Sequence, residues 1–437
     1  MTQKTLEALR RGDLAGAREL RLPGLDEFPR EIFGLAETLE ILDLSDGRLE
    51  SLPEDMSRLR KLRVLFCSGN RFRRLPPALG DCGALRMIGF RRVGLREVPG
   101  ESLPPQLRWL TLTDNEIEGL PAELGERPQL QKLMLAGNRL ASLPSTLRNA
   151  EKLELIRLSS NRFDSLPSWL SALPALAWIS WGANACEREI AAPAPAPASF
   201  SQLDIGALLG EGASGRVHRA TWRREGEAAR SVAVKIFKGA ITSDGLPARE
   251  MAASLTAGDH PNLTAALGRL SDHPDGAQAM LMPLLPPHWR RLAGPPDFES
   301  CSRDVYDPAL RLSTEAGLSL LHGVATAVAH LHARGLMHGD LYAHNILWDG
   351  VAGEAALGDF GAACSLPLGP EGDAWRRIES RAFGVLLEEV LARCPPESAA
   401  IQKLRDLARA CLGKEARERP LLTEAAREIQ AAGHGSA

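Results

Sequence analysis

The first half of the chain repeats one pattern of apolar and polar positions, L-x-x-L-x-L-x-x-N-x-L-x-x-L-P, as in LRWLTLTDNEIEGLP and LQKLMLAGNRLASLP. The residues at the Asn position are Gly47, Asn70, Val93, Asn115, Asn138, Asn161 and Asn184, at intervals of 23, 23, 22, 23, 23 and 23 residues. A unit of this length is too small to bury its apolar face alone, so successive units must stack. The pattern therefore predicts a solenoid with one short strand in each unit.

Each unit divides its residues between a core and a turn. Leu110 and Leu112 flank one residue of a predicted strand and therefore point into the interior together. The Asn that follows carries both a donor and an acceptor, and we expect it to bond backbone groups that the turn leaves unpaired. Gly47 and Val93 cannot make these bonds, which predicts weaker turns there. Asn184 lacks a following L-P and is expected to end the array.

These motifs resemble the leucine-rich repeat over about residues 20–190, and residues 1–19 are expected to form an N-terminal helical cap. The resemblance implies an α/β solenoid with a concave face. On this face, six residues before each Asn position, the strands carry Ile41, Val64, Met87, Trp109, Lys132, Leu155 and Trp178, and Met134 stands four residues before Asn138. Because a row this apolar is costly to leave in water, we expect a protein substrate or regulator to contact Trp109, Trp178, Met87 and Met134. In the alternative interpretation, the row packs against the following domain.

A boundary follows the repeats. Residues 191–199 read AAPAPAPAS, a composition that favours extended polyproline geometry. At roughly 3.1 Å per residue this stretch spans up to about 28 Å. The sequence therefore predicts a stiff linker over residues 191–202.

The hydrophobic pattern changes after the linker. Apolar strands are expected in LLGEGASGRVHRATW and SVAVKIFKG, followed by a helix in PAREMAAS. Helical spacing then governs STEAGLSLLHGVATAVAHLHARG, and two further helices are expected in RAFGVLLEEVL and EARERPLLTEA. The second half is thus expected to begin with strands and to end with helices.

Glycine and charged residues in this half occur at positions that suggest a phosphate-binding site. Gly210, Gly212 and Gly215 form G-x-G-x-x-G between two predicted strands, and glycines let backbone N–H groups approach a phosphate closely. Lys235 ends the V-A-V-K of the second strand, and Glu250 follows 15 residues later on a predicted helix. An ion pair between the two would hold the amine against the phosphates of a nucleotide.

A second cluster surrounds the segment HGDLYAHN, which runs from His338 to Asn345. It places Asp340 and Asn345 on one short loop. The apolar NILW follows, and then Gly358-Asp359-Phe360-Gly361, with Asp359 nineteen residues after Asp340. This spacing is typical of a base and two metal ligands in phosphotransferases.

The glycine loop, A-V-K, a helix Glu, H-x-D-x-x-x-x-N, D-F-G and R-P occur in order, and residues 203–432 resemble a eukaryotic-type protein kinase domain. The resemblance implies an α+β bilobal fold, with an N-lobe over about 203–285 and a C-lobe over about 286–432. It implies transfer of the γ-phosphate of ATP to Ser/Thr hydroxyls, with Asp340 as the base. Asn345 and Asp359 would hold Mg²⁺. The implied nucleotide contacts are Gly210, Glu211, Gly212, Gly215, Val217, Lys235, Glu250, Met282 and Leu284, and the implied catalytic residues are Asp340, Lys235 and Asn345.

The sequence departs from the family pattern in four places. Gly339 replaces an Arg that often reads a phosphate on the activation segment, and Tyr342 replaces a Lys that often steadies the γ-phosphate. Glu379 stands where the family has an Asp, only 17 residues (362–378) after the D-F-G, and no A-P-E is present. Arg419 lacks its usual Glu partner and is expected to pair with Glu379 or another acid.

These departures leave two alternatives open. One is a scaffold whose repeats bind partners while a pseudokinase domain is weak or silent. The other is a phosphotransferase that acts on small-molecule hydroxyls, because H-G-D also occurs in relatives of aminoglycoside and choline kinases. We expect the protein kinase, because those enzymes generally lack this glycine loop together with D-F-G and R-P.

Composition indicates which partners and which cellular compartment to expect. The formal net charge is -3, so nothing favours a nucleic-acid partner or an anionic membrane. The seven cysteines are scattered and form no C-x-x-C pair, which fits a reducing compartment better than a disulfide framework. No apolar run approaches the roughly 18–20 residues that span a bilayer. We therefore expect a cytoplasmic protein, and the Ala- and Arg-rich usage looks bacterial.

Overall fold

The computed structural model describes residues 2–190, 198–212, 214–239, 245–270 and 272–434. Most of the predicted linker, residues 191–197, therefore lies outside the described residues. Contacts between Cα atoms divide the chain into two compact units. The first comprises residues 1–175 and 184–186, and the second comprises residues 176–183 and 187–437.

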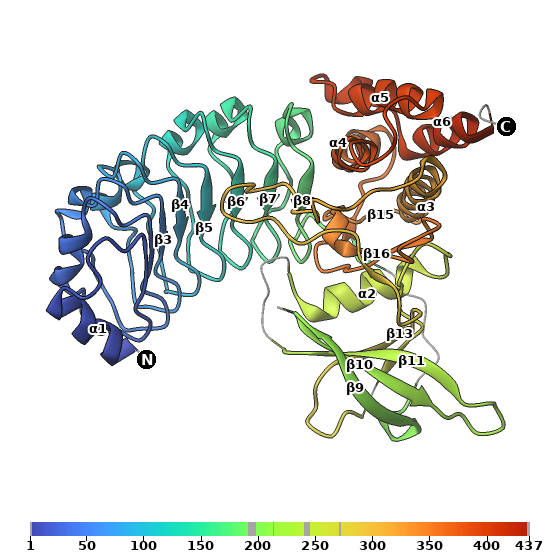
Figure 1. Cartoon of the computed structure of the whole chain (residues 1–437), viewed down its shortest axis with the longest axis horizontal. Helices are drawn as coiled ribbons and strands as arrows, with labels where there is room; N and C mark the ends of the chain where they lie inside the picture. The colour runs from blue at the N-terminus through green and yellow to red at the C-terminus, as the bar shows by residue number, and fades with distance from the viewer. Residues whose placement is uncertain (1, 191–197, 213, 240–244, 271, 435–437) are drawn as a thin grey trace. The chain divides into compact units, whose positions relative to one another are not determined.

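Parallel strands form the first unit, as the repeat pattern predicts. A helix, α1 (Thr2–Arg11), precedes them. The strands are β1 (Glu19–Arg21), β2 (Ile41–Asp43), β3 (Val64–Phe66), β4 (Met87–Gly89), β5 (Trp109–Thr111), β6 (Lys132–Met134) and β7 (Leu155–Arg157). They follow one another in a sheet whose eighth and last strand is β8 (Trp178–Ser180), and β3 to β7 can be followed side by side in Figure 1. The structure confirms the solenoid.

Register keeps the core continuous from one repeat to the next. Leu42 pairs with Leu65, and Leu110 pairs with Leu133, so each buried Leu stacks on its counterpart in the next strand. Short 3-10 helices return the chain on the other side of each unit, for example Ala122–Glu126 and Ser145–Asn149. Stacking of this kind buries a face that no single repeat could bury.

The Asn side chains make the predicted bonds. Asn138 Nδ2 donates to the carbonyl oxygens of Leu112 and Leu135, both at 2.9 Å, and its Oδ1 accepts from the backbone N–H of Ile117 at 3.2 Å. One side chain thus satisfies three backbone groups in two neighbouring repeats. At Gly47 an added Cβ would lie 2.3 Å from the carbonyl oxygen of Leu25, so this turn has no room for any side chain.

Replacing Asn138 by Ala should therefore destabilise the repeats strongly. Three buried backbone groups would lose their partner, and an unsatisfied buried group costs about 1–3 kcal/mol. We expect the free energy of unfolding to fall by about 2–4 kcal/mol in chemical denaturation. Asn149, which is exposed, is the matched control, and Asn149→Ala should change stability by less than about 0.5 kcal/mol. Equal effects of the two substitutions would show that the ladder of Asn bonds contributes little.

An antiparallel sheet and one helix begin the second unit. The strands are β9 (Leu203–Glu211), β10 (Gly215–Trp222), β11 (Arg230–Phe237), β12 (Gly268–Leu270) and β13 (Ala279–Pro283), in the spatial order β12-β13-β11-β10-β9. Helix α2 (Pro247–Ala257) packs on this sheet through Met251 and Leu255, which contact Phe237 and Met280. Figure 1 shows β9, β10 and β11 as one twisted layer.

Helices dominate the rest of the second unit. They are α3 (Thr314–Ala333), α4 (Pro370–Leu391), α5 (Ala399–Cys411) and α6 (Leu422–His434). Short strands accompany them: β14 (Arg290–Arg291), β16 (Ile346–Trp348) and β17 (Ala355–Leu357) form one sheet, and β15 (Leu336–Met337) pairs with β18 (Cys364–Ser365). Ser313 caps α3 by accepting from the N–H of Ala316, and Gly335 at φ +71° follows its end.

One helix begins earlier than the sequence pattern predicts. Helix α4 starts at Pro370, so only residues 362–369 separate it from Gly361. Proline presets the helical φ at a first turn, and Glu371 and Asp373 complement the positive end of the helix dipole. The segment after D-F-G is therefore shorter still than the 17 residues expected.

Candidate active site

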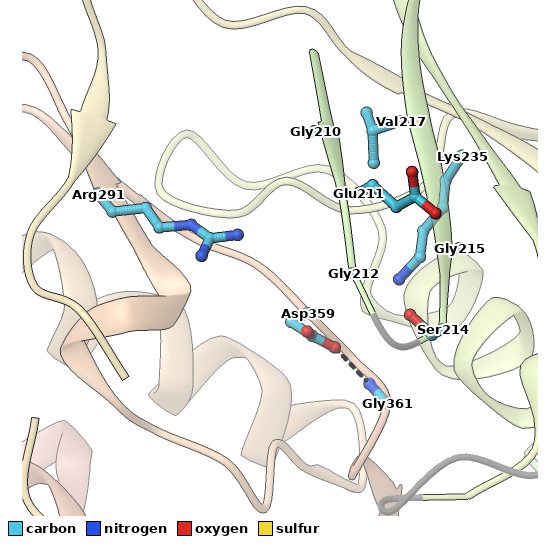
Figure 2. A pocket seen from close by; sticks show the side chains of 10 residues that line it. All are labelled: Gly210, Glu211, Gly212, Ser214, Gly215, Val217, Lys235, Arg291, Asp359 and Gly361. Atoms are coloured by element: carbon cyan, nitrogen blue, oxygen red, sulfur yellow. Dashed lines mark hydrogen bonds between the residues drawn. The ribbon is translucent and has the colours of Figure 1, made fainter. Parts of the chain in front are cut away.

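Two adjoining cavities, of about 480 Å³ and 180 Å³, lie between the strand layer and the helical part of the second unit. Both are lined by Gly210, Val217, Lys235, Arg291 and Asp359. The larger one is also lined by Glu250, Met280, Met282, Leu284 and Asn345. The smaller one adds Glu211, Gly212 and Gly215 and is drawn in Figure 2. The structure thus brings these sequence-predicted residues together.

The glycine loop joins β9 to β10 above the smaller cavity. The backbone N–H of Gly212 donates to the carbonyl of Gly215 at 2.9 Å, which closes the hairpin. An added Cβ at Gly215 would lie 2.4 Å from the carbonyl oxygen of Ile236, whereas Gly210 and Gly212 face open space. The loop therefore offers backbone rather than side chains to whatever enters the cavity.

Glu211 has cationic partners within this loop. Its carboxylate lies 2.7 Å from Lys238 Nζ and 3.3 Å from Arg216 Nε. The hydrogen bonds from Lys238 and Arg216 hold the pKa of Glu211 below its ordinary value. A carboxylate repels phosphate, so any contribution of Glu211 to nucleotide binding comes from its backbone.

Lys235 and Glu250 form the predicted ion pair. Lys235 is 8 % exposed and Glu250 is 3 % exposed, so each charge depends on the other for compensation. Strand β11 places Lys235 between Val217 of β10 and Met280 of β13. The pair fixes the amine where it faces both cavities.

Asp340, Asn345 and Asp359 are joined through one network. Asn345 Nδ2 donates to the carboxylate of Asp340 at 2.8 Å and to its carbonyl oxygen at 2.9 Å. The N–H of Gly358 donates to the carbonyl of Asn345 at 2.9 Å, which draws Asp359 alongside. Asp359 has a φ of +60°, and its Oδ1 accepts from the N–H of Gly361 at 3.1 Å (Figure 2). A left-handed Asp is strained, and such strain concentrates at functional sites.

Glu379 bonds to the backbone of the loop that carries Asp340 and Asn345. It is fully buried, and its Oε1 accepts from the N–H of Gly339 at 2.7 Å while its Oε2 lies 2.7 Å from His332 Nε2. Burial opposes ionisation, but the hydrogen bond and charge of His332 and the charge of His338 hold the pKa of Glu379 below its ordinary value. An ionised Glu379 therefore anchors the backbone just before Asp340.

Arg419 is buried and donates to backbone carbonyl groups. Its Nε donates to the carbonyl of Gly413 at 2.9 Å, and Arg377 donates to the carbonyl of Arg419. Burial lowers the pKa of Arg419 to about 10. Glu379 itself bonds to Gly339 and His332, and the expected pairing of Arg419 with Glu379 or another acid stays a prediction.

Gly339 stands where the family has Arg because a side chain does not fit there. Its φ is +74°, and an added Cβ would lie 2.6 Å from the carbonyl oxygen of Ile179 and 2.7 Å from that of Ala362. Ile179 belongs to β8, which is part of this unit. Packing of β8 against the loop that carries Asp340 thus explains why residue 339 is Gly rather than Arg.

Tyr342 stands where the family has Lys and is buried against Trp178. The two rings stack at 4.2 Å with an angle of 8° between them. Trp178 is 1 % exposed, and its indole N–H donates to the carbonyl of Leu341 at 2.9 Å. The prediction that Trp178 contacts an external partner is therefore wrong, and for this residue the alternative interpretation, packing against the following domain, is confirmed.

Two further members of the predicted binding row are covered. Met87 is 4 % exposed and Met134 is 7 % exposed. Side chains on neighbouring strands lie close enough to cover one another, as the Phe66 ring covers Gly89. Trp109 is only partly buried, and Lys132 Nζ lies 3.9 Å from its ring centroid. Of the four predicted contact residues, Trp109 alone retains an accessible side chain.

The segment between β14 and α3 contributes a residue that no motif revealed. Asp304 accepts from the backbone N–H of His344 at 3.0 Å, and its other oxygen lies 2.7 Å from His344 Nδ1. Burial opposes protonation, but the hydrogen bond and charge of Asp304, with the charges of Asp340 and Asp359, raise the pKa of His344. Asp304 thus fixes the backbone just before Asn345.

Glu389 gives this region a pH dependence. It accepts from the hydroxyl of Tyr306 at 3.0 Å, and burial together with the charge of Asp304 raises its pKa to about 7. The residues facing Glu389 are Asp304, Tyr306, Arg303 and Arg393. A carboxyl group whose pKa is raised on folding stabilises the fold below its unfolded pKa, and this contribution is lost as pH rises through the folded pKa.

Raising the pH from 5 to 8 should therefore lower the free energy of unfolding. The raised pKa values of Glu389 and His344 act in the same direction across this window. We expect Glu389→Gln, which keeps the bond from Tyr306, to reduce the loss by about 1–3 kcal/mol. Denaturant titrations at the two pH values measure the difference, and parallel losses in variant and wild type would contradict it. Glu388→Gln, on the exposed neighbour, is the control.

A bilobal site of this kind, with a Lys–Glu pair, a glycine loop and an Asp–Asn–Asp network, defines a protein kinase domain. The family model for protein tyrosine and serine/threonine kinase matches residues 203–368, and that for leucine rich repeat matches residues 105–163. The chain therefore carries a leucine-rich repeat region followed by a protein kinase domain.

Curated relatives match shorter stretches. The chain is 32% identical to podocan of Mus musculus over 123 residues, which are 27% of this chain and 18% of podocan. It is 35% identical to leucine-rich repeat serine/threonine-protein kinase 1 of Mus musculus over 68 residues, which are 15% of this chain and 3% of that protein. It is 33% identical to vasorin of Homo sapiens over 123 residues, 26% of this chain and 18% of vasorin. The chain thus matches less than a fifth of the length of these relatives.

Among the residues that the structure describes, no helix combines the length and apolar character needed to cross a bilayer.

Proposed function

We propose that the protein is an ATP-dependent kinase that phosphorylates Ser/Thr hydroxyls of proteins and recruits a protein partner through its repeats. The observation that carries this proposal is the convergence of Lys235, Asn345 and Asp359 on one cavity beneath a glycine loop. The β16–β17 hairpin brings Asn345 and Asp359 together, and Lys235 reaches the same cavity from β11, so one ligand could contact all three side chains.

The residues present fit ATP with Mg²⁺. Met280, Met282 and Leu284 give one end of the larger cavity an apolar lining suited to a base, and the glycine loop and Lys235 give the other end donors suited to phosphates. Carboxylate and amide oxygens are the ligands that Mg²⁺ prefers, so Asp359 and Asn345 would hold it. When bound there, the metal would supply positive charge against the phosphates.

Within this site the chain's own residues divide the work. Asp340 would orient the substrate hydroxyl and accept its proton, with its carboxylate held in place by Asn345. Lys235 would bind the nucleotide phosphates, positioned by Glu250. Because Tyr342 lies under Trp178, it does not replace the missing Lys, whereas the guanidinium of Arg291 points into the smaller cavity (Figure 2). Arg291 would supply the second positive charge.

The repeat surface is proposed to bind a protein substrate or regulator. Leucine-rich repeats commonly present one extended face to a partner. Trp109, with Lys132 beside it, is the remaining aromatic anchor on the predicted row. A cytoplasmic location is also part of the proposal, supported by seven cysteines that are all free thiols.

Label transfer from radiolabelled ATP with Mg²⁺ tests the proposal directly. We expect wild-type protein to label itself or a generic protein substrate on Ser/Thr. Nucleotide binding without transfer to any protein would support a scaffold with a silent kinase domain. ATP consumption with a panel of small hydroxyl compounds, and none with proteins, would replace the proposal with a small-molecule phosphotransferase, which the short segment 362–369 favours.

A further inference from the structure

The last repeat strand belongs to the kinase unit by its contacts. Residues 176–183 and 187–188 group with the second unit, although β8 completes the sheet of the repeats. Three of its contacts fall on the loop that carries Asp340, on helix α2 with Glu250, and on the segment that follows Asp359. We refer to residues 176–183 and 187–188 as the brace.

The first contact is with the catalytic loop. The indole of Trp178 donates to the carbonyl of Leu341, the residue directly after Asp340, and stacks on Tyr342. Arg303 lies on the same indole, 5.4 Å from its ring centroid. With the carbonyl of Ile179 packed against Gly339, the brace contacts the residues on both sides of Asp340.

The second contact is with helix α2. Glu187, whose side chain is 1 % exposed, forms an ion pair with Arg249. Arg249 is the neighbour of Glu250, which holds Lys235. A buried carboxylate that loses its cation becomes an uncompensated charge, so this pair constrains where the helix lies.

The third contact is with the segment after Asp359. Oε1 of Glu187 accepts from the N–H of Ser365 at 3.2 Å, and the Ser365 hydroxyl donates to the carbonyl of Arg188 at 3.0 Å. Oε2 of Glu187 accepts from the N–H of Ala183 at 2.7 Å, a hydrogen bond within the brace. One carboxylate therefore joins the brace, helix α2 and strand β18.

We propose that the brace is a positioning element of the kinase site, in which Trp178 orients the catalytic loop and Glu187 orients helix α2. The inference rests on the proposed kinase function and adds two positioning residues that lie outside residues 203–368, the range matched by the kinase family. Since a misplacement of about 1 Å in a catalytic group can cost on the order of 10²-fold in rate, loosening either contact lowers turnover without removing any group that touches the substrate.

The full-length chain with graded substitutions tests this. Trp178→Leu removes the N–H and the ring and should lower kcat by about 10–100-fold. Trp178→Phe keeps the stacking and should retain most of the rate. Nucleotide affinity, measured by titration with ATP and Mg²⁺, should change by less than about threefold in both, because the brace does not line the cavities. Trp222→Phe, which also removes a buried indole hydrogen bond but on β10, is the control and should leave kcat unchanged.

Glu187 is tested by a double-mutant cycle. Glu187→Gln and Arg249→Gln should each lower kcat by about tenfold, and the double variant should lose no more than the larger single loss, because both remove the same interaction. Additive losses, kcat within twofold of wild type, or losses that track the unfolded fraction would each overturn the inference. If the wild type itself transfers no phosphate, the proposed function fails and the inference falls with it. An active wild type with fully active variants sinks the inference alone.

Discussion

Replacing Asp340 by Asn will lower phosphoryl transfer by about 10²–10⁴-fold while nucleotide binding is retained. The amide has nearly the shape of the carboxylate, so Asn345 still finds an oxygen to bond, but the side chain no longer accepts the proton of a hydroxyl. Lys235 and Glu250, which would hold the nucleotide, are untouched. Initial rates of label transfer, with affinity measured in parallel, separate the two effects.

Asp406 provides the matched control for this substitution. It is 70 % exposed in its side chain and pairs with Arg409 on helix α5, away from the cavities. Asp406→Asn should leave the rate within twofold. Persistent labelling by Asp340→Asn at the wild-type rate would remove Asp340 from the chemistry.

Restoring the family's Arg at residue 339 should inactivate the protein. A side chain at φ +74° costs about 1–2 kcal/mol, and overpacking against the carbonyls of Ile179 and Ala362 adds about 1–3 kcal/mol. We expect Gly339→Ala to lower the free energy of unfolding by about 2–5 kcal/mol and Gly339→Arg to lower it at least as much. Denaturant titration and label transfer measure both consequences.

Gly335 is the control that distinguishes the cost of backbone strain from the cost of steric overlap at Gly339. Its φ is +71°, but an added Cβ meets nothing within 4 Å. Gly335→Ala should therefore cost only the conformational part, about 1–2 kcal/mol. If Gly339→Arg proved as stable and as active as wild type, the close approach of β8 to the loop would be refuted.

The repeat period predicted the solenoid, its strands and the Asn bonds, because these depend on local alternation and a constant interval. The turn that precedes each Asn was not predicted. The residues there have positive φ: Asp46, Gly69, Arg92, Asp114, Gly137, Ser160 and Ala183. Only two are glycine, so the chemical signal of a left-handed position is lost although its spacing is regular.

The kinase residues were predictable for a different reason. Lys235, Glu250, Asp340, Asn345 and Asp359 stand in short motifs whose residue types are dictated by phosphate chemistry. The structure brings Lys235, Glu250, Asn345 and Asp359 to one cavity and ties Asp340 to Asn345. Their catalytic roles remain predictions until transfer is measured.

The long-range contacts that support the loop could not be predicted from the sequence. Asp304 reaches His344 across 40 residues, and Trp178 reaches Leu341 across 163. Nothing in the local pattern distinguishes these side chains from ordinary polar or core residues, and Trp178 begins β8 as Trp109 begins β5, so it falls in the row that resembles a binding face. Only the tertiary packing assigns their roles.

Strand β8 is the final strand of the repeat sheet and, by its contacts, a member of the kinase unit. A graft of this kinase unit onto another recognition domain should therefore begin at Leu176, so that β8 stays with the unit.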